Sequence, residues 1–373
     1  MKNILIIAGE TSGDLHGSNL VKSINKIDTS FKFFGIGGDR MKEVGVDVVY
    51  HINSLSFMGF VEVIKHIPYL KKVKEHLLQI VIEKDPSTAI LIDYPGFNLS
   101  IAKELHKLGK KIFYYISPQI WAWGKSRIDL IRKVVHKMIV VFPFEEKMYR
   151  DANINVSFVG HPLLDVIENY QFETKEKFFE RYALDPQKKL LTIFPGSRKQ
   201  ELIKILPIVS EAALKLKEDL NLNVAIAGLN TMTQEFYKKY FDNEFKLIFN
   251  NNYELMKYAD VGIIKSGTST LEAALFELPF VVVYKTSLLS YLISKNLIQI
   301  DNISLANIVA GEKIVSELIQ KDCNPKKIYN EIKELFINEI KKNQLRENLK
   351  RIKKLLGEKG ASQRAAEIIL SEI

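Results

Sequence analysis

The fold is decided by the stretch Asp260-Val-Gly-Ile-Ile-Lys-Ser-Gly-Thr-Ser-Thr-Leu-Glu272-Ala-Ala-Leu-Phe-Glu-Leu-Pro-Phe-Val-Val-Val-Tyr284. Its apolar run from Val261 to Ile264 predicts a buried strand, and helix-forming residues follow the small-residue turn Ser266-Gly-Thr268. Pro279 ends that helix, and Phe280 to Tyr284 predicts a second strand. The stretch therefore predicts a βαβ unit, the building block of a parallel sheet covered by helices.

The turn inside this unit is a candidate anion site. It precedes a helix N-terminus, which carries partial positive charge and several free N–H groups. Glu272, in the first helical turn, could then accept hydrogen bonds from a ribose of the same ligand. An alternative is a capping box, because Ser269-x-x-Glu272 can also satisfy only the N–H groups of its own helix. The pattern alone leaves both interpretations open.

Length and composition indicate a two-domain globular protein. The chain has 373 residues, of which 47% are hydrophobic and 26% charged. Its one cysteine, Cys323, allows no internal disulfide, so we expect a reducing compartment. No apolar run approaches the roughly 20 residues of a membrane span, and the N-terminal one is too short for a signal peptide. The net charge of +9 favours anionic partners: nucleic acid, an anionic membrane surface or phosphorylated substrates.

Strands and helices alternate twice along the chain. In the first half, the predicted strands begin near Ile4, Phe31, Ala89, Lys111 and Val156, and Val134 to Phe142 predicts a further passage from helix to strand. In the second half, they begin at Leu190, Asn223, Lys246, Val261 and Phe280. This alternation predicts an α/β fold with two consecutive Rossmann-like, doubly wound parallel-sheet domains. We expect an N-terminal domain at 1–165, a linker within 163–189, a second domain at 185–345, and basic C-terminal helices at 346–373 that could pack back on the N-terminal domain.

Polar residues follow the predicted strands of the first half, at the sheet edge where α/β proteins bind ligands. Asp93 ends a buried strand and could act as a general base, or could simply accept loop N–H groups. Glu10 and Asp14 lie in the first glycine-rich turn, on the same edge. Asn98 could orient Asp93 or cap the loop.

In the second half, Pro195-Gly-Ser-Arg198 follows the first strand. The planar guanidinium of Arg198 is suited to a phosphate, although a surface salt bridge is the alternative. One diphosphate nucleotide could use Arg198, the Ser266-Gly-Thr268 turn and Glu272 together. The chain has no Asp-x-Asp, His-x-x-x-His or cysteine cluster, so we expect no dedicated metal site.

An apolar segment, Leu55 to Ile64, runs directly into a lysine-rich helix. Such a combination can lie on a membrane; the alternative is a helix with one buried and one solvated face. The candidate membrane contacts are Phe57, Met58, Phe60, Lys65, Lys71, Lys72 and Lys74.

Seven motifs in a fixed order carry a resemblance to a known family. They are Gly9-Glu-Thr-Ser-Gly-Asp14, Met58-Gly-Phe-Val-Glu-Val63, Asp93-x-Pro-Gly-Phe-Asn98, Ser117-Pro-x-x-Trp-Ala-Trp123, Gly160-His-Pro162, Pro195-Gly-Ser-Arg198 and Ser266-Gly-Thr-x-x-Leu-Glu272. Over nearly its whole length the chain closely resembles the lipid-A-disaccharide synthases, GT-B glycosyltransferases of Gram-negative bacteria.

The resemblance implies two Rossmann-like domains facing a cleft and an inverting transfer without metal or other cofactor. UDP-2,3-diacylglucosamine would be joined through a β-1,6 bond to 2,3-diacylglucosamine 1-phosphate, releasing UDP. It also implies a cytoplasmic protein, peripheral on the anionic cytoplasmic face of the inner membrane, with no nucleic-acid partner. A homodimer is compatible with it.

The resemblance also implies residue roles. Asp93 would be the catalytic base and Glu10 a further active-site acid. The UDP-sugar-binding residues would be Gly196, Ser197, Arg198, Ser266, Gly267, Thr268, Glu272 and Asn307, and the acceptor-binding residues Ser12, Asp14 and Asn98. Two departures stand out: Gly96 replaces an acid found in some members, and Ala306 replaces the usual proline before Asn307, which should leave that loop less rigid.

Two other functions fit parts of the pattern. Another GT-B enzyme, either a different UDP-sugar transferase or a UDP-sugar 2-epimerase, would share the second half but would not depend on acyl chains. A basic nucleic-acid-binding α/β protein would account for the charge, although the chain contains no recognised RNA-binding motif.

Overall fold

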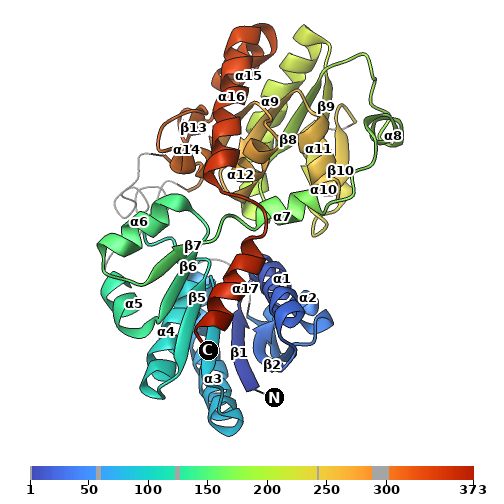
Figure 1. The fold of residues 1–373 in the computed structure, drawn as a ribbon. Helices are drawn as coiled ribbons and strands as arrows, with labels where there is room; N and C mark the ends of the chain where they lie inside the picture. Colours follow the sequence, from blue (N-terminus) through green and yellow to red (C-terminus); the bar gives the residue numbers. More distant parts are fainter. Residues whose placement is uncertain (1, 56–59, 122–126, 242, 288–301) are drawn as a thin grey trace. The chain divides into compact units, whose positions relative to one another are not determined.

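A computed structural model (Figure 1) describes residues 2–55, 60–121, 127–241, 243–287 and 302–373, with the side chains of 60–65 left out. The chain forms two compact units. The first contains residues 1–165 and 357–373, and the second contains residues 166–356.

The first unit is built on a parallel sheet with strand order β3-β2-β1-β4-β5-β6-β7. Its strands are β1 (Lys2–Ala8), β2 (Phe31–Gly37), β3 (Asp47–His51), β4 (Thr88–Ile92), β5 (Lys111–Tyr115), β6 (Lys137–Val140) and β7 (Val156–Phe158). The order reverses direction after β3, so β1 and β4 lie side by side at the centre. In a doubly wound sheet, this reversal is the point where loops part and ligands bind.

Helices cover both faces of this sheet. They are α1 (Thr11–Ile27), α2 (Asp39–Glu43), the 3-10 turn η1 (Ile52–Ser54), α3 (Phe60–Lys84), α4 (Pro95–Lys107), α5 (Ile128–Val134), α6 (Pro143–Asp151) and α17 (Ala361–Ser371). Right-handed crossovers place α1 and α2 on one face and α3 to α6 on the other. On the second face, Leu5 and Ile7 of β1 share a core with Val73, Leu77 and Val81 of α3.

The second unit repeats the plan. Its parallel sheet has the order β10-β9-β8-β11-β12-β13. The strands are β8 (Leu190–Phe194), β9 (Asn223–Gly228), β10 (Lys246–Phe249), β11 (Val261–Lys265), β12 (Phe280–Tyr284) and β13 (Glu317–Ile319). The direction again reverses, here between β8 and β11, which pair along Val261 to Ile264.

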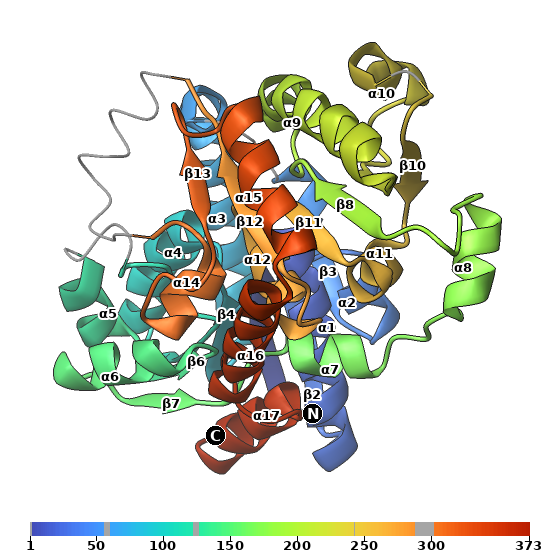
Figure 2. The same cartoon turned by 90° about the horizontal axis from the view of Figure 1, so that it is seen from above.

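The helices of the second unit also lie on both faces of its sheet. They are α8 (Lys175–Arg181), α9 (Lys199–Leu220), α10 (Gln234–Phe241), α11 (Asn252–Tyr258), α12 (Thr268–Leu275), α14 (Leu305–Ala310), α15 (Pro325–Ile337) and α16 (Glu339–Leu355), and α7 (Leu163–Glu168) spans the unit boundary. Figure 2 shows α9 and α15 side by side, and they pack against each other.

The C-terminal segment is divided between the two units. The sequence predicts one group of helices at 346–373, but α16 packs against α12 and α14 of the second unit, whereas α17 packs against α1 of the first. The guanidinium of Arg364 donates to the carbonyl of Val159 at 2.9 and 2.6 Å, and the Gly360 N–H donates to Asp165 at 2.5 Å. These bonds secure α17 to the end of β7.

No helix in the described part of the chain is both long and apolar enough to cross a bilayer. The longest helix described, α3, has 25 residues; between 66 and 84 it buries Val73, Leu77 and Val81 and exposes Lys71 and Lys72.

Candidate functional site

The carboxyl end of β4 in the first unit holds Asp93 in an unusual backbone conformation. Asp93 and Tyr94 have φ angles of +44° and +47°, in the left-handed region that most residues avoid. Two side chains hold the turn: the Tyr114 hydroxyl donates to the Asp93 carbonyl at 2.6 Å, and Asn98 Nδ2 donates to it at 2.7 Å. Asn98 also donates to the carbonyl of Ile92 at 3.1 Å. Strain of this kind persists only where the surroundings enforce it, and it often marks functional residues.

The carboxyl group of Asp93 has an altered acidity. Burial, together with the nearby negative charge of Glu10, raises its pKa to about 6, and a hydrogen bond from the Tyr94 N–H opposes the shift. At pH 7 such a group is mostly ionised, yet it is a much stronger base than an ordinary aspartate.

Glu10 lies close to the carboxyl group of Asp93 because the preceding residue, Gly9, packs directly against the Tyr94 ring. A Cβ on Gly9 would lie only 2.2 Å from the Tyr94 ring, so glycine is required there. The Tyr94 hydroxyl in turn donates to the carbonyl of Leu55 at 3.2 Å. Glu10 itself is exposed, at the start of α1.

Ser12 and Asp14, the other two residues predicted at this edge of the sheet, have different environments at the start of α1. The helix begins at Thr11, so Asp14 lies within α1 and not in the turn where the sequence placed it, and Ser12 is exposed in the first helical turn. Asp14 is 3% exposed and accepts the N–H groups of Gly38, Arg40 and Met41 at 2.7 to 3.2 Å. Its carboxylate is therefore committed to the start of α2, which does not fit the predicted direct contact with an acceptor.

Asn98 requires a similar correction. It is fully buried, and its amide nitrogen is used to hold the turn at Asp93. It thus orients Asp93, as one of the two sequence-based alternatives proposed, and is not placed to touch an acceptor.

A buried carboxyl group that the sequence analysis did not identify lies near the end of β5. Glu145, 1% exposed, accepts the Ser117 hydroxyl at 2.6 Å and the Trp121 indole N–H at 3.1 Å. Burial raises its pKa to about 7 against these hydrogen bonds. Glu145 therefore holds the segment from Ser117 to Trp121 in place; its position in the first turn after Phe142-Pro143 was the available sequence signal.

The second unit presents Pro195-Gly-Ser-Arg198 at the carboxyl end of β8. Gly196 has a φ angle of +131°, and a Cβ there would lie 2.6 Å from Glu201 Oε2. Glycine thus lets Glu201 fold back onto the loop and accept the Ser197 N–H at 3.0 Å. Arg198 is exposed at the N-terminus of α9, so its guanidinium is available to a ligand.

The neighbouring turn is only partly as expected. Gly267 is the residue before α12, and Thr268 is its exposed first residue. Ser266 is 8% exposed, and its hydroxyl donates to the carbonyl of Ile303 at 2.7 Å. Its side chain therefore ties two loops together and is not free for a phosphate.

Glu272 does not form the capping box that was the alternative interpretation. That box requires Ser269 to precede the helix, but α12 begins at Thr268. Burial raises the pKa of Glu272, opposed by hydrogen bonds from the Ser269 and Tyr253 side chains. A partly buried acid with polar neighbours on this edge remains suitable for a hydroxyl-bearing ligand.

Asn307 is fully buried and entirely occupied within the protein. Its Oδ1 accepts the N–H groups of Ile314 and Val315, both at 2.9 Å, and its Nδ2 donates to Glu317 at 2.8 Å. Glu317 also accepts the Ser304 N–H at 2.9 Å. The predicted UDP-sugar contact by Asn307 does not fit this arrangement. The loop is held by Glu317, so it does not depend on a proline at position 306.

Among the candidate membrane contacts, Phe57 and Met58 lie outside the described residues, and Phe60 and Lys65 belong to α3 without described side chains. Further along α3, Lys71 and Lys72 are exposed, together with Ile67 (42%) and Tyr69 (36%). Lys74 instead donates to the Ser100 hydroxyl at 3.1 Å. The later part of α3 has one buried and one solvated face, and this leaves the membrane interpretation untested.

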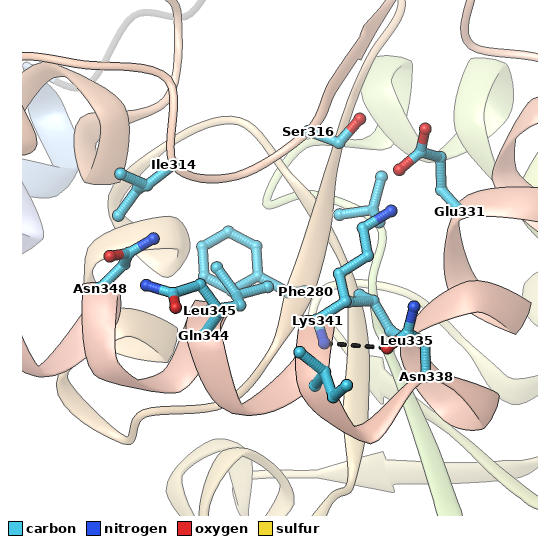
Figure 3. A pocket seen from close by; sticks show the side chains of 12 residues that line it. Phe280, Ile314, Ser316, Glu331, Leu335, Asn338, Lys341, Gln344, Leu345 and Asn348 are labelled. Carbon is cyan, nitrogen blue, oxygen red and sulfur yellow. Dashed lines mark hydrogen bonds between the residues drawn. The ribbon is translucent and has the colours of Figure 1, made fainter.

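A pocket of about 420 Å³ in the second unit lies away from these residues. Figure 3 shows Phe280 and Leu345 in its wall, with Lys341 and Glu331 at its side. Phe280 begins β12 and Ser316 precedes β13, so the pocket is at the amino edge of the sheet. The predicted donor residues follow the carboxyl ends of β8 and β11, so the pocket is not part of that site.

Two parallel sheets, each with polar side chains after its central strands, are the architecture of the GT-B fold. Solved structures agree. A UDP-GlcNAc 2-epimerase from Neisseria meningitidis bound to UDP-GlcNAc matches with a TM-score of 0.69 at 12% identity, covering 100% of both chains. CalG4, the calicheamicin glycosyltransferase, matches with a TM-score of 0.65 at 12% identity, covering 100% of this chain and 98% of that one. These likenesses establish the fold.

The family comes from the sequence comparisons. The family model described as lipid-A-disaccharide synthetase matches residues 4–372. The lipid-A-disaccharide synthase of Trichlorobacter lovleyi is 38% identical over 376 residues, covering 100% of this chain and 98% of the relative. That of Geobacter sulfurreducens is 38% identical, covering 98% and 96%. The chain belongs to the lipid-A-disaccharide synthetase family.

Proposed function

We propose that this protein is an inverting glycosyltransferase of lipid A biosynthesis. It transfers 2,3-diacylglucosamine from UDP-2,3-diacylglucosamine to the 6-hydroxyl of 2,3-diacylglucosamine 1-phosphate, giving the β-1,6 disaccharide 1-phosphate and UDP. The observation that carries the proposal is the family match over residues 4–372, because it spans both units and both candidate sheet edges. The same match does not favour a nucleic-acid-binding protein.

The donor is assigned to the second unit. Arg198 is exposed beside the N-terminus of α9, and Gly267 and Thr268 lie at the start of α12, so charge and free N–H groups are available to a diphosphate. Glu272 would accept hydrogen bonds from the ribose. Gly196 and Ser197 contribute through the backbone, and Ser266 by holding the turn.

The acceptor and the chemistry are assigned to the first unit. The acceptor 6-hydroxyl attacks the anomeric carbon, the bond from that carbon to the UDP oxygen breaks, and the hydroxyl proton passes to Asp93. A pKa near 6 suits this role, since the group is ionised at neutral pH and basic enough to take the proton. Glu10 and Ser12, both exposed on this edge, would contact the acceptor.

Three of the residues assigned to substrates by resemblance act indirectly in this scheme. Asn98 holds the backbone of Asp93, Asp14 holds the start of α2, and Asn307 holds the segment before β13. We regard them as positioning residues.

The transfer is proposed to need no metal or other cofactor. Among the described residues, no three His, Cys, Asp or Glu side chains gather in a way that could hold a metal ion. The test is direct: turnover by the purified enzyme should be the same with and without EDTA.

The protein is also proposed to act on the cytoplasmic face of the inner membrane, where acylated substrates reside. Support comes from the exposed Lys71 and Lys72 beside Ile67 and Tyr69 on α3, a combination suited to an anionic surface.

The experiment that tests the function measures UDP release. UDP should appear from UDP-2,3-diacylglucosamine only when 2,3-diacylglucosamine 1-phosphate is also present. In parallel, UDP-N-acetylglucosamine is offered alone and its 2-epimer is sought by NMR. Epimer formation, or UDP release with no dependence on the acylated acceptor, would replace the proposal with one of the other functions of this fold.

A further inference from the structure

An ion pair at the carboxyl edge of the second sheet has no part in the roles assigned so far. Lys265 is the last residue of β11, and Glu201 lies in the first turn of α9. The Lys265 ammonium and Glu201 Oε1 are 2.7 Å apart, and the two side chains are only 16% and 17% exposed. This pair therefore joins the two loops that the donor is proposed to use.

The position of the ammonium group is informative. A Cβ on Gly267 would lie 3.9 Å from Lys265 Nζ and would meet nothing else, so the ammonium stands beside the turn that begins α12. A helix N-terminus carries partial positive charge, and a cation beside it is unfavourable unless an anion is also present. Glu201 supplies that anion.

The charge balance changes when a diphosphate arrives. Arg198, Lys265 and Glu201 together carry two positive charges and one negative charge. The second oxygen of Glu201 accepts the Ser197 N–H at 3.0 Å, so this carboxylate stays within the loop. A diphosphate bound there would be repelled by Glu201 unless Lys265 lay between the two and balanced both.

We propose that Lys265 is a second cationic ligand of the donor diphosphate, and that Glu201 is the positioning residue that holds its ammonium in place. This inference rests on the proposed function, since it requires a nucleoside diphosphate at this edge. A lysine is suited to the role, because its ammonium has three donors on a flexible stem and can bond a phosphate oxygen and Glu201 together.

The competing explanation is a purely structural ion pair that ties β11 to α9. The two explanations differ for the double variant K265Q/E201Q, which removes both charges and leaves no unpaired buried ion. A structural pair predicts that UDP affinity returns to the parent value in the double variant. A diphosphate ligand predicts that any thermal stability lost in K265Q returns in the double variant, but that the affinity for UDP stays below the parent value.

The test is calorimetric titration of UDP and of uridine into the full-length parent, K265Q and K265Q/E201Q. A matched control is K217Q, since Lys217 lies near the other end of α9 and pairs with Glu244 at 2.5 Å. Because charge-assisted bonds are the strong ones, we expect both Lys265 variants to bind UDP about tenfold more weakly. Uridine binding should be unchanged in every variant, and K217Q should match the parent with both ligands.

Two results would overturn the inference while leaving the proposed function intact: a double variant with parent affinity for UDP, or a K265Q variant that loses UDP and uridine equally. A parent protein that fails to bind UDP would instead count against the proposed function itself. Thermal melting of each variant identifies any loss caused by unfolding.

Discussion

Replacing Asp93 by asparagine should lower activity and raise stability at the same time. Asparagine preserves the shape of the side chain and tolerates the left-handed backbone at φ +44° better than most residues. It cannot take a proton. Removal of a general base typically costs about 10²- to 10⁴-fold, so turnover should fall by that order while UDP affinity, assigned to the other unit, stays near the parent value.

The stability change follows from the pKa of Asp93. Its folded-state value, about 6, lies above the ordinary value of 3.8, so folding disfavours the ionised form. A carboxyl group whose pKa is raised by folding contributes its full share of the folding stability below its unfolded-state pKa. That contribution is lost as the pH rises through its folded-state pKa. The difference between the two pKa values corresponds to a loss of at most about 3 kcal/mol of folding stability at neutral pH. The uncharged asparagine would restore this stability. The gain should shrink as the pH falls from 7.5 to 5.

The assays are initial rates of UDP release and thermal melting, both measured from pH 5 to pH 8. The parent rate should fall about tenfold per pH unit below pH 6, because the base becomes protonated. Asp129, exposed on α5, offers a control: D129N should resemble the parent in both assays. Near-parent turnover by D93N would refute the assignment and move the base role to Glu10, and a D93N protein that melts below the parent at pH 7.5 would refute the electrostatic reasoning.

Three further predictions concern other parts of the molecule. E145Q should shift the tryptophan fluorescence to the red, because the indole N–H of Trp121 bonds to Glu145. The emission maximum of the parent should change with a midpoint near pH 7 as Glu145 ionises. A parent emission maximum that is constant from pH 6 to 8 would argue against this. E272Q should weaken UDP binding about tenfold in calorimetry, while equal affinities would leave Glu272 as a packing residue. K71Q/K72Q should reduce co-sedimentation with anionic vesicles, because each lysine contributes about 1 kcal/mol to the binding free energy at low salt. Binding that is unchanged by both the substitutions and added salt would favour a merely solvated helix face.

The architecture was largely predictable because its central strands are buried on both faces. Ile4 to Ala8 and Val261 to Ile264 are continuous apolar runs, and nothing but a parallel sheet covered by helices accommodates several of them in alternation with helices. The two strands that were not predicted, β3 and β13, lie at sheet edges. Strand β13 has three residues and begins with Glu317, so its sequence carries almost no pattern.

The site was predictable only in part. The sequence positions of Asp93 and Arg198 correctly predicted that each follows the carboxyl end of a strand. In a parallel sheet these ends all lie at the same edge. The sequence positions could not reveal which way a polar side chain turns. Asp14, Asn98 and Asn307 are each directed into the protein by hydrogen bonds with backbone groups that lie 24, 6 and 8 positions away in the sequence.

The pairing of Lys265 with Glu201 illustrates the same limit from the other side. The two residues are 64 positions apart, and they meet because β8 and β11 are neighbours in the sheet. A lysine that ends a strand and a glutamate in a first helical turn are each unremarkable alone. Only the strand order makes them a pair.

If this chain joins two acylated glucosamines with inversion, the structure of the reaction product will show it. The purified protein is incubated with UDP-2,3-diacylglucosamine and 2,3-diacylglucosamine 1-phosphate, and the lipid product is examined by mass spectrometry and NMR. We expect a tetraacyl disaccharide 1-phosphate whose new anomeric linkage is β and reaches the 6-position. An α linkage, a different position, or unchanged starting lipids in the presence of a folded protein that binds UDP would contradict it.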